Sequence, residues 1–362
     1  MSVIIFLAVL SVLIIVHEAG HFATAKALGV KVDRFAVGFG PKLFSRVYKG
    51  TEFAACLFPL GGYVKMTGDE RAECKGTPHE YYSHPPGHRA LIVLFGPIVN
   101  YLMAFVCFFI VFLIGYPTLS PKIGEVVAGH PAQTVGLQTN DKIIRINAAD
   151  IESWEQIQKS ISTSKTDALD LTVVRNNQTL QIRVLPKIEN IVNIFGQKES
   201  IRIIGIKPKE EIILLKYGVG KSLWNSFDRL VEITTMTYKA LYRMATGAMS
   251  PKDSMTGPIG IFYIIQKAAS MGISYLLYIV AIISASLAIF NLLPLPVLDG
   301  GHLFLLGVEK FRHRPLSPKT DEIINRTGLV FIIGLAVFIF YNDVERYGLI
   351  DKFVHFWQKL GL

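Results

Sequence analysis

Residues 3–21 read VIIFLAVLSVLIIVHEAGH, a run without a charged side chain from Val3 to Val16 that leads directly into His17-Glu18-Ala19-Gly20-His21. On a helix the two histidines are one turn apart, so they project from the same face and can bind one metal ion, with Glu18 beside them to move protons. At 1.5 Å rise per residue, His17 lies roughly 20 Å along the helix from Val3, short of the ~30 Å that crosses a bilayer core. The histidines are therefore predicted to lie within the membrane.

A carboxylate at this depth requires a partner, because a charged residue at the centre of a membrane helix costs about 2.5–3.5 kcal/mol. A metal ion supplies that partner. One alternative is that residues 1–25 are a cleaved signal peptide, since Ala23-Thr24-Ala25 resembles a cleavage site. The lack of Lys or Arg before Val3, and the presence of Glu18 with two histidines near the cleavage region, argue against it.

Composition indicates a polytopic α-helical membrane protein with room for one modest soluble domain. The chain has 362 residues, of which 51% are hydrophobic, and its mean hydropathy is positive. The net charge of +9 is then not a sign of nucleic-acid binding, and we predict no nucleic-acid partner. The bilayer is the expected surroundings.

Four apolar segments are candidates for membrane spans: residues 3–28, 91–115, 272–293 and 328–341. The last is short, a length equally typical of a buried helix. Lys and Arg gather in residues 31–89, which hold nine of them, and in residues 310–326, which hold five. By the positive-inside rule both segments face the cytoplasm. The termini and residues 116–271 are then expected outside, on the periplasmic side.

Residues 31–66, between the first two spans, are rich in glycine and in aromatic and β-branched residues. This pattern favours short β-hairpins. Because the segment is apolar and adjoins the histidine helix, we expect it to fold back into the membrane, where a sheet edge could pair with an extended peptide. An ordinary surface loop is the alternative.

Residues 116–190 are predicted to form a small β-rich domain. They contain Gly129-His130-Pro131-Ala132, Gly136-Leu137 and Ile146-Asn147, then a short helical pattern and two strands joined by Asn176-Asn177. Asn-Asn suits the positive φ of a tight hairpin turn. The order of these motifs resembles a PDZ domain, a family that accepts peptide ends by strand addition. Whether this one would bind a peptide or only restrict access to the membrane site is left open.

The membrane core is expected in two halves, residues 1–115 and 272–362. Between the small domain and the second half, residues 191–271 are read as a linker that carries an amphipathic helix within residues 212–247. This helix is expected on the outer membrane surface, with Trp224 at the interface. A plain soluble helix is the alternative.

A catalytic zinc typically takes three protein ligands and keeps one position open, so two imidazoles are too few. Asp299 is the only carboxylate between Asp253 and Glu309. Pro294 and Pro296 unwind the third span just before it, which leaves the carboxylate free to turn toward a neighbouring helix. We predict Asp299 as the third ligand, although a lone Asp at such a boundary is otherwise read as a helix cap. His302 is a candidate to support the site from outside the ligand set.

Together these motifs resemble the site-2 protease family, specifically the bacterial regulator-of-sigma-E type. The resemblance covers nearly the whole chain and rests on HEAGH, on Gly96-Pro97-Ile98-Val99-Asn100, on NLLPLPVLDGGH at residues 291–302 and on the PDZ-like insert. It implies that His17, His21 and Asp299 bind zinc, that Glu18 activates water, and that Asn291, with Pro294 and Pro296, binds substrate. Familiar members carry two tandem PDZ domains, whereas this chain has room for one.

The resemblance further implies an intramembrane zinc metalloprotease of the bacterial inner membrane. Its expected substrates are single-span proteins already trimmed outside the membrane, such as anti-sigma factors or signal-peptide remnants, and the expected outcome is extracytoplasmic stress signalling. Two other classes stay open on the residues alone. A metal-ion transporter leaves the placement of Glu18 and the PDZ-like insert without a role, and an inactive scaffold does not explain HEAGH together with LDG.

Overall fold

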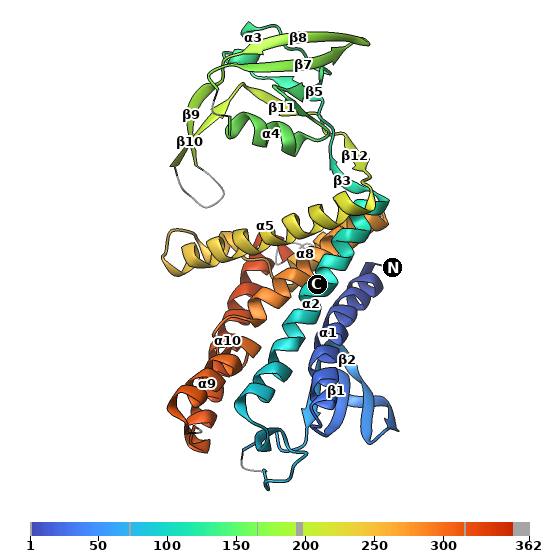
Figure 1. The fold of residues 1–362 in the computed structure, drawn as a ribbon, viewed down its shortest axis with the longest axis vertical. Coiled ribbons are helices and arrows are strands. Elements are labelled where there is room, and N and C mark those ends of the chain that lie inside the picture. Colours follow the sequence, from blue (N-terminus) through green and yellow to red (C-terminus); the bar gives the residue numbers. More distant parts are fainter. Residues whose placement is uncertain (1, 72–73, 165, 193–197, 315, 350–362) are drawn as a thin grey trace, which may run out of the picture. The chain divides into compact units, whose positions relative to one another are not determined.

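The computed structural model describes residues 2–71, 74–164, 166–192, 198–314 and 316–349 (Figure 1). The chain forms two compact units. The first comprises Met1–Phe109, Asn225–Lys239 and Ser250–Leu362, and the second Ile110–Trp224 and Ala240–Met249.

Among the described residues, four helices are long and apolar enough to cross a membrane. They are α1 (Ser2–Ala27), α2 (Pro86–Ile114), α8 (Ile273–Asn291) and α10 (Pro318–Arg346, with the span over Lys319–Arg346). The four predicted segments thus form helices that are long and apolar enough to be spans, and the fourth helix is longer than its apolar centre. The N-terminus of α10 is capped: the Ser317 side chain accepts a hydrogen bond from the Thr320 N–H, and Pro318 occupies the first turn.

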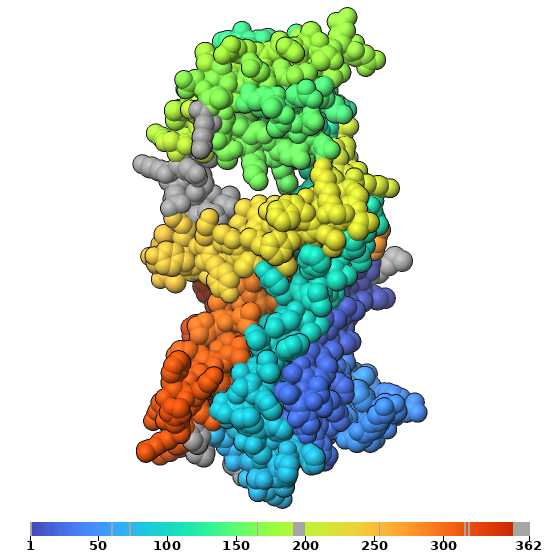
Figure 2. All heavy atoms as spheres, in the orientation of Figure 1, coloured from blue at the N-terminus to red at the C-terminus, as the bar shows by residue number. Residues whose placement is uncertain are grey.

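The predicted hairpins of residues 31–66 form one sheet from β1 (Val32–Tyr48) and β2 (Thr51–Met66). Each strand bends and contributes two extended stretches, so Arg34 pairs with Glu52 on one side and with Lys65 on the other. Left-handed φ values of 85° at Gly38 and 90° at Gly40 allow the bend in β1. Residues 62–66 lie at an edge of this sheet, which packs against α1 (Figure 2).

Shorter elements complete the first unit. They are the 3-10 turn η1 (Tyr81–Ser83), α6 (Pro251–Ser254), α7 (Pro258–Ser270) and α9 (Asp299–Arg312). The buried Asp343 of α10 accepts from the backbone N–H groups of Gly257 and Gly260 at 3.1 and 2.9 Å, and thereby caps the start of α7. The predicted amphipathic helix within residues 212–247 forms α5 (Val219–Ala245).

The second unit is β-rich. Its central antiparallel sheet has the order β6-β5-β7-β8, formed by Ala149–Asp150, Lys142–Ile146, Leu169–Arg175 and Gln178–Val184. The turn between β7 and β8 has φ of 50° at Asn176 and 63° at Asn177, as the sequence predicts. Helix α4 (Trp154–Ser162) and the short α3 (Pro131–Thr134) complete the apolar core, which includes Trp154 and Ile157.

Strand pairing in this unit continues past residue 190, the predicted end of the small domain. β11 (Ile206–Pro208) pairs with β4 (Ile123–Val126), and β12 (Ile212–Leu215) pairs with β3 (Tyr116–Leu119). β9 (Lys187–Val192) and β10 (Lys198–Ile203) form a further hairpin. The segment read as a linker therefore supplies strands, and Ile204 lies in the same core.

Candidate metal centre

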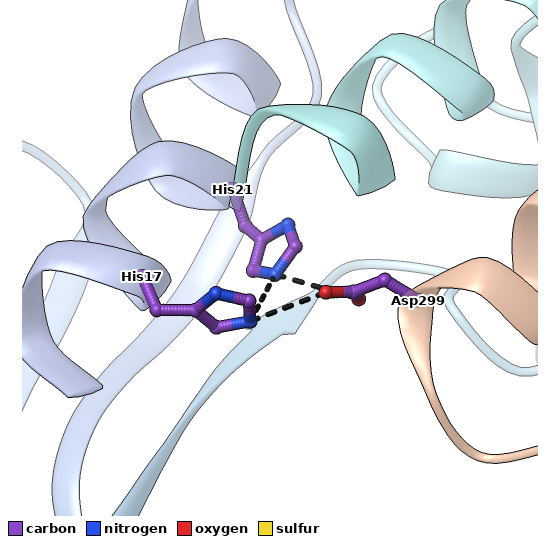
Figure 3. Close-up of side chains that lie close together, drawn as sticks. All are labelled: His17, His21 and Asp299. Carbon is purple, nitrogen blue, oxygen red and sulfur yellow. Dashed lines mark hydrogen bonds and ion pairs between the residues drawn. The ribbon is translucent and has the colours of Figure 1, made fainter. Parts of the chain in front are cut away.

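The two histidines of α1 project from one face of the helix toward a common point (Figure 3). Both side chains are buried, each with 9% of its surface exposed. Their rings lie edge to face with centroids 4.7 Å apart, and the two Nε2 atoms are 3.2 Å apart. The i, i+4 spacing therefore brings two imidazole nitrogens together, as predicted.

Asp299 is brought to the histidines by the break after α8. The helix ends at Asn291, and α9 begins with Asp299 in its first turn. The chain passes very close to itself here, because a Cβ at Gly301 would lie 2.1 Å from the backbone oxygen of Leu295. Only glycine permits this approach, which places the Asp299 carboxylate 3.2 Å from His17 Nε2 and 3.6 Å from His21 Nε2.

The three side chains fit a zinc ion. One donor atom from each lies within 4.8 Å of the other two. Zinc bonds of 2.0–2.2 Å in a tetrahedron separate neighbouring donors by about 3.3–3.6 Å. The two Nε2 atoms are 3.2 Å apart, Asp299 Oδ2 is 3.2 Å from His17 Nε2, and Asp299 Oδ1 is 3.6 Å from His21 Nε2. Asp299 Oδ2 is buried without a hydrogen-bond partner among the described residues, a cost that a cation would offset.

Glu18 and two of the three metal-binding candidates border a cavity of about 520 Å³. Glu18, His21 and Asp299 line one part of it, together with the edge residues 63–66 of β2. Val64 presents its backbone to the Glu18 carboxylate, and a Cβ at Gly62 would lie 3.2 Å from Glu18 Cγ. A sheet edge and a carboxylate therefore share the wall of a space large enough for water and an extended chain.

The far part of the cavity is charged. Arg89 and Glu309, both buried, form an ion pair at 2.5 Å, and Arg71 contacts the same carboxylate at 2.6 Å. Burial raises the pKa of Glu309, but the hydrogen bonds from Arg89 and Arg71 outweigh it and hold that pKa below its ordinary value. This end of the cavity is therefore lined by charged and polar side chains.

Comparison with known proteins decides the family. The profile of peptidase family M50 matches residues 5–335. The chain belongs to peptidase family M50, the site-2 proteases. This M50 protease is a metalloprotease, and the metal of the family is zinc.

Several bacterial relatives match along almost the whole chain. A provisionally named zinc metalloprotease of Campylobacter jejuni is 35% identical over 341 residues, which are 93% of this chain and 92% of the relative. A provisionally named zinc metalloprotease of Rickettsia conorii is 33% identical, covering 96% of this chain and 99% of the relative. The protease RseP of Yersinia pestis is 28% identical, covering 95% and 98%.

The predicted substrate residues of this M50 protease lie at different distances from the centre. Asn291 Nδ2 lies 3.4 Å from His17 Nε2, so its amide borders the metal position. Pro294 is exposed, whereas Pro296 is half-buried against α10, where a Cβ at Gly328 would lie 2.2 Å from Pro296 Cβ. His302 is exposed and lines the cavity outside the three-residue cluster.

Sequence reasoning missed the groups behind the histidines. His21 Nδ1 lies 2.9 Å from the backbone oxygen of Ile92, and His17 Nδ1 lies 3.3 Å from the side-chain amide of Asn100. A backbone oxygen leaves no signal in a sequence. Asn100 was visible as the last residue of Gly96-Pro97-Ile98-Val99-Asn100, but nothing in that motif alone points it at a histidine.

Proposed function

We propose that this M50 protease cleaves a peptide bond in the transmembrane segment of a single-span membrane protein. In this proposal His17, His21 and Asp299 hold the zinc ion and Glu18 is the general base. The buried cluster carries the proposal, since its donor distances suit zinc and one of its carboxylate oxygens lacks any other partner among the described residues. The two histidines lie on α1, a helix that can cross a membrane, and this location supports chemistry within the bilayer.

The chain's own residues supply the proton transfers and the positioning. When bound, zinc polarises a carbonyl oxygen and lowers the pKa of water to about 7. Glu18 then takes the proton from the attacking water and delivers it to the leaving amine, a role that its place on the cavity wall allows. Asn291 lies near enough to the centre to donate its amide N–H to the substrate.

The substrate must be extended before it can be cut, because a helix holds its carbonyls in i→i−4 hydrogen bonds. Residues 62–66 of β2 lie at an edge of the sheet, and residues 63–66 line the cavity beside Glu18. We propose that an unwound substrate adds as a strand to this edge, which aligns its backbone with the metal. Pro294 and Pro296 are proposed to contact the substrate from the turn before Asp299, outside the lining of this cavity.

We further propose that the substrates are anti-sigma-factor-like proteins or signal-peptide remnants in the bacterial inner membrane, first trimmed on the outer side. Support comes from the motif resemblance and from the match to protease RseP of Yersinia pestis. The β-rich second unit is proposed as a PDZ domain on the periplasmic side that admits only short stubs. With β11 and β12 included, it extends to residue 215.

The test is cleavage of a tagged single-span substrate in membranes, with bound zinc measured on each protein. Glu18→Gln is expected to retain zinc and lose cleavage. Glu70→Gln is the matched control, because Glu70 is an exposed carboxylate that lines the same cavity and has no proposed role. Equal cleavage by wild type and Glu18→Gln, or no zinc in either, would favour the transporter or scaffold instead.

A further inference from the structure

One face of α2 supports both histidines of α1. Ile92, Gly96 and Asn100 are spaced four residues apart, so they lie in a row along the helix. The Ile92 backbone oxygen is 2.9 Å from His21 Nδ1, and the Asn100 amide is 3.3 Å from His17 Nδ1. Gly96, between them, leaves room for the rings, because a Cβ there would lie 2.3 Å from His21 Nε2. α2 therefore lies against both imidazoles along this row.

The hydrogen bonding of His17 determines which atom Asn100 must present. His17 Nε2 faces Asp299 and is the nitrogen available to a metal. A neutral imidazole that binds metal through Nε2 carries its proton on Nδ1, and that N–H needs an acceptor. The group 3.3 Å from Nδ1 is the amide of Asn100. Its oxygen is therefore the atom required there.

The buried environment of Asn100 agrees with this requirement. The residue is fully buried, and its backbone oxygen accepts from Ser284 Oγ at 2.8 Å. With Nδ2 toward His17, the buried Oδ1 has no hydrogen-bond partner among the described residues. Rotating the amide by 180° exchanges the two atoms. The rotation gives Oδ1 a donor and gives His17 its acceptor.

We propose that Asn100 is a positioning residue, whose side-chain oxygen accepts the His17 Nδ1–H and holds the Nε2 lone pair on the metal. The inference rests on the proposed metal site of His17, His21 and Asp299. His21 receives the same support from the Ile92 backbone, which no substitution removes. Substitution of Asn100 can therefore change the orientation of His17.

The experiment measures zinc affinity by chelator competition on the purified full-length protein in detergent. Asn100→Ala removes the acceptor and is expected to weaken zinc binding by about 10- to 100-fold. Asn100→Asp can accept but cannot donate, so it is expected to bind zinc within a few-fold of wild type. Ser284→Ala is the matched control. It removes a buried hydrogen bond to the same asparagine without touching the imidazole, and should bind zinc as wild type does.

Asn100→Asp decides the question even if Asn100→Ala does not fold. If the amide served as a donor to His17, or only filled space through its neutral group, the aspartate would lose zinc as severely as alanine, and the proposal would be wrong. Zinc affinity in folded Asn100→Ala equal to wild type would also overturn it. His17→Ala distinguishes failure of the Asn100 proposal from failure of the proposed metal site. Tight zinc binding by this variant would refute the metal site itself.

Discussion

Gly96→Ala perturbs the metal centre from a residue with no functional group. A Cβ at this position would lie 2.3 Å from both Cε1 and Nε2 of His21 and 3.0 Å from Cε1 of His17. Non-bonded carbon atoms settle at about 3.5–4.0 Å. The His21 ring, or the whole of α2, must therefore move by more than about 1 Å.

This displacement is large compared with the tolerance of a zinc site, where ligand distances hold within about 0.2 Å. A misplacement of about 1 Å can cost about 100-fold in rate. We therefore expect kcat/KM to fall at least about 100-fold, with weaker zinc binding. Overpacking costs about 1–3 kcal/mol of stability, but alanine regains up to about 1 kcal/mol of helix propensity. The loss of activity should thus exceed any loss of folding.

The assay combines cleavage of a single-span substrate, zinc affinity and thermal melting. Gly87→Ala is the matched control in the same helix, because a Cβ there meets no described atom within 4 Å. It should behave as wild type in all three measurements. If Gly96→Ala cleaves and binds zinc as wild type does, the close approach of α2 to the histidines is wrong.

Three further predictions concern the metal, the charged end of the cavity and acid stability. Removing zinc with a chelator should lower the melting temperature of the wild type, because a ligand that binds only the folded state stabilises it. The melting temperature of Asp299→Asn should stay nearly unchanged. An equal shift in both proteins would contradict the ligand set. Glu309→Gln leaves Arg89 buried without its carboxylate, so a loss of about 3–5 kcal/mol is expected in chemical unfolding, and a loss below 1 kcal/mol would count against the buried pair. Burial raises the pKa of Glu80, but hydrogen bonds from Cys74 and three backbone N–H groups outweigh it and lower that pKa to about 2. The stabilisation is present above the ordinary value of 4.5 and is lost as pH falls toward 2, so Glu80→Gln should flatten the fall in melting temperature across that window, and an unchanged slope would refute the contact.

The residues proposed to carry the chemistry could be found from sequence because each combines a local pattern with an unusual setting. His17 and His21 follow helical spacing inside an apolar run, and Asp299 follows a proline break in another. Their proximity could be predicted because a catalytic zinc typically takes three protein ligands, and two imidazoles are too few. Asn100 and the Ile92 oxygen could not be assigned, since their roles depend on how α1 and α2 pack.

The long-range pairing of strands could also not be predicted from the sequence. Turn residues predict where the strands of residues 31–66 break, but not that residues 32–37 pair on both sides. Likewise β12 pairs Leu215 with Tyr116, about one hundred residues apart in sequence. Such register depends on tertiary contacts and not on local propensity. Local patterns therefore did not predict that strands beyond residue 190 pair with β3 and β4.

Anomalous scattering at the zinc absorption edge, recorded from crystals of the zinc-loaded protein, tests the central claim most directly. The account predicts one strong peak within bonding distance of Nε2 of His17, Nε2 of His21 and a carboxylate oxygen of Asp299. A peak elsewhere, for example at the neighbouring rings of His84 and His88, with none between α1 and α9, would contradict it.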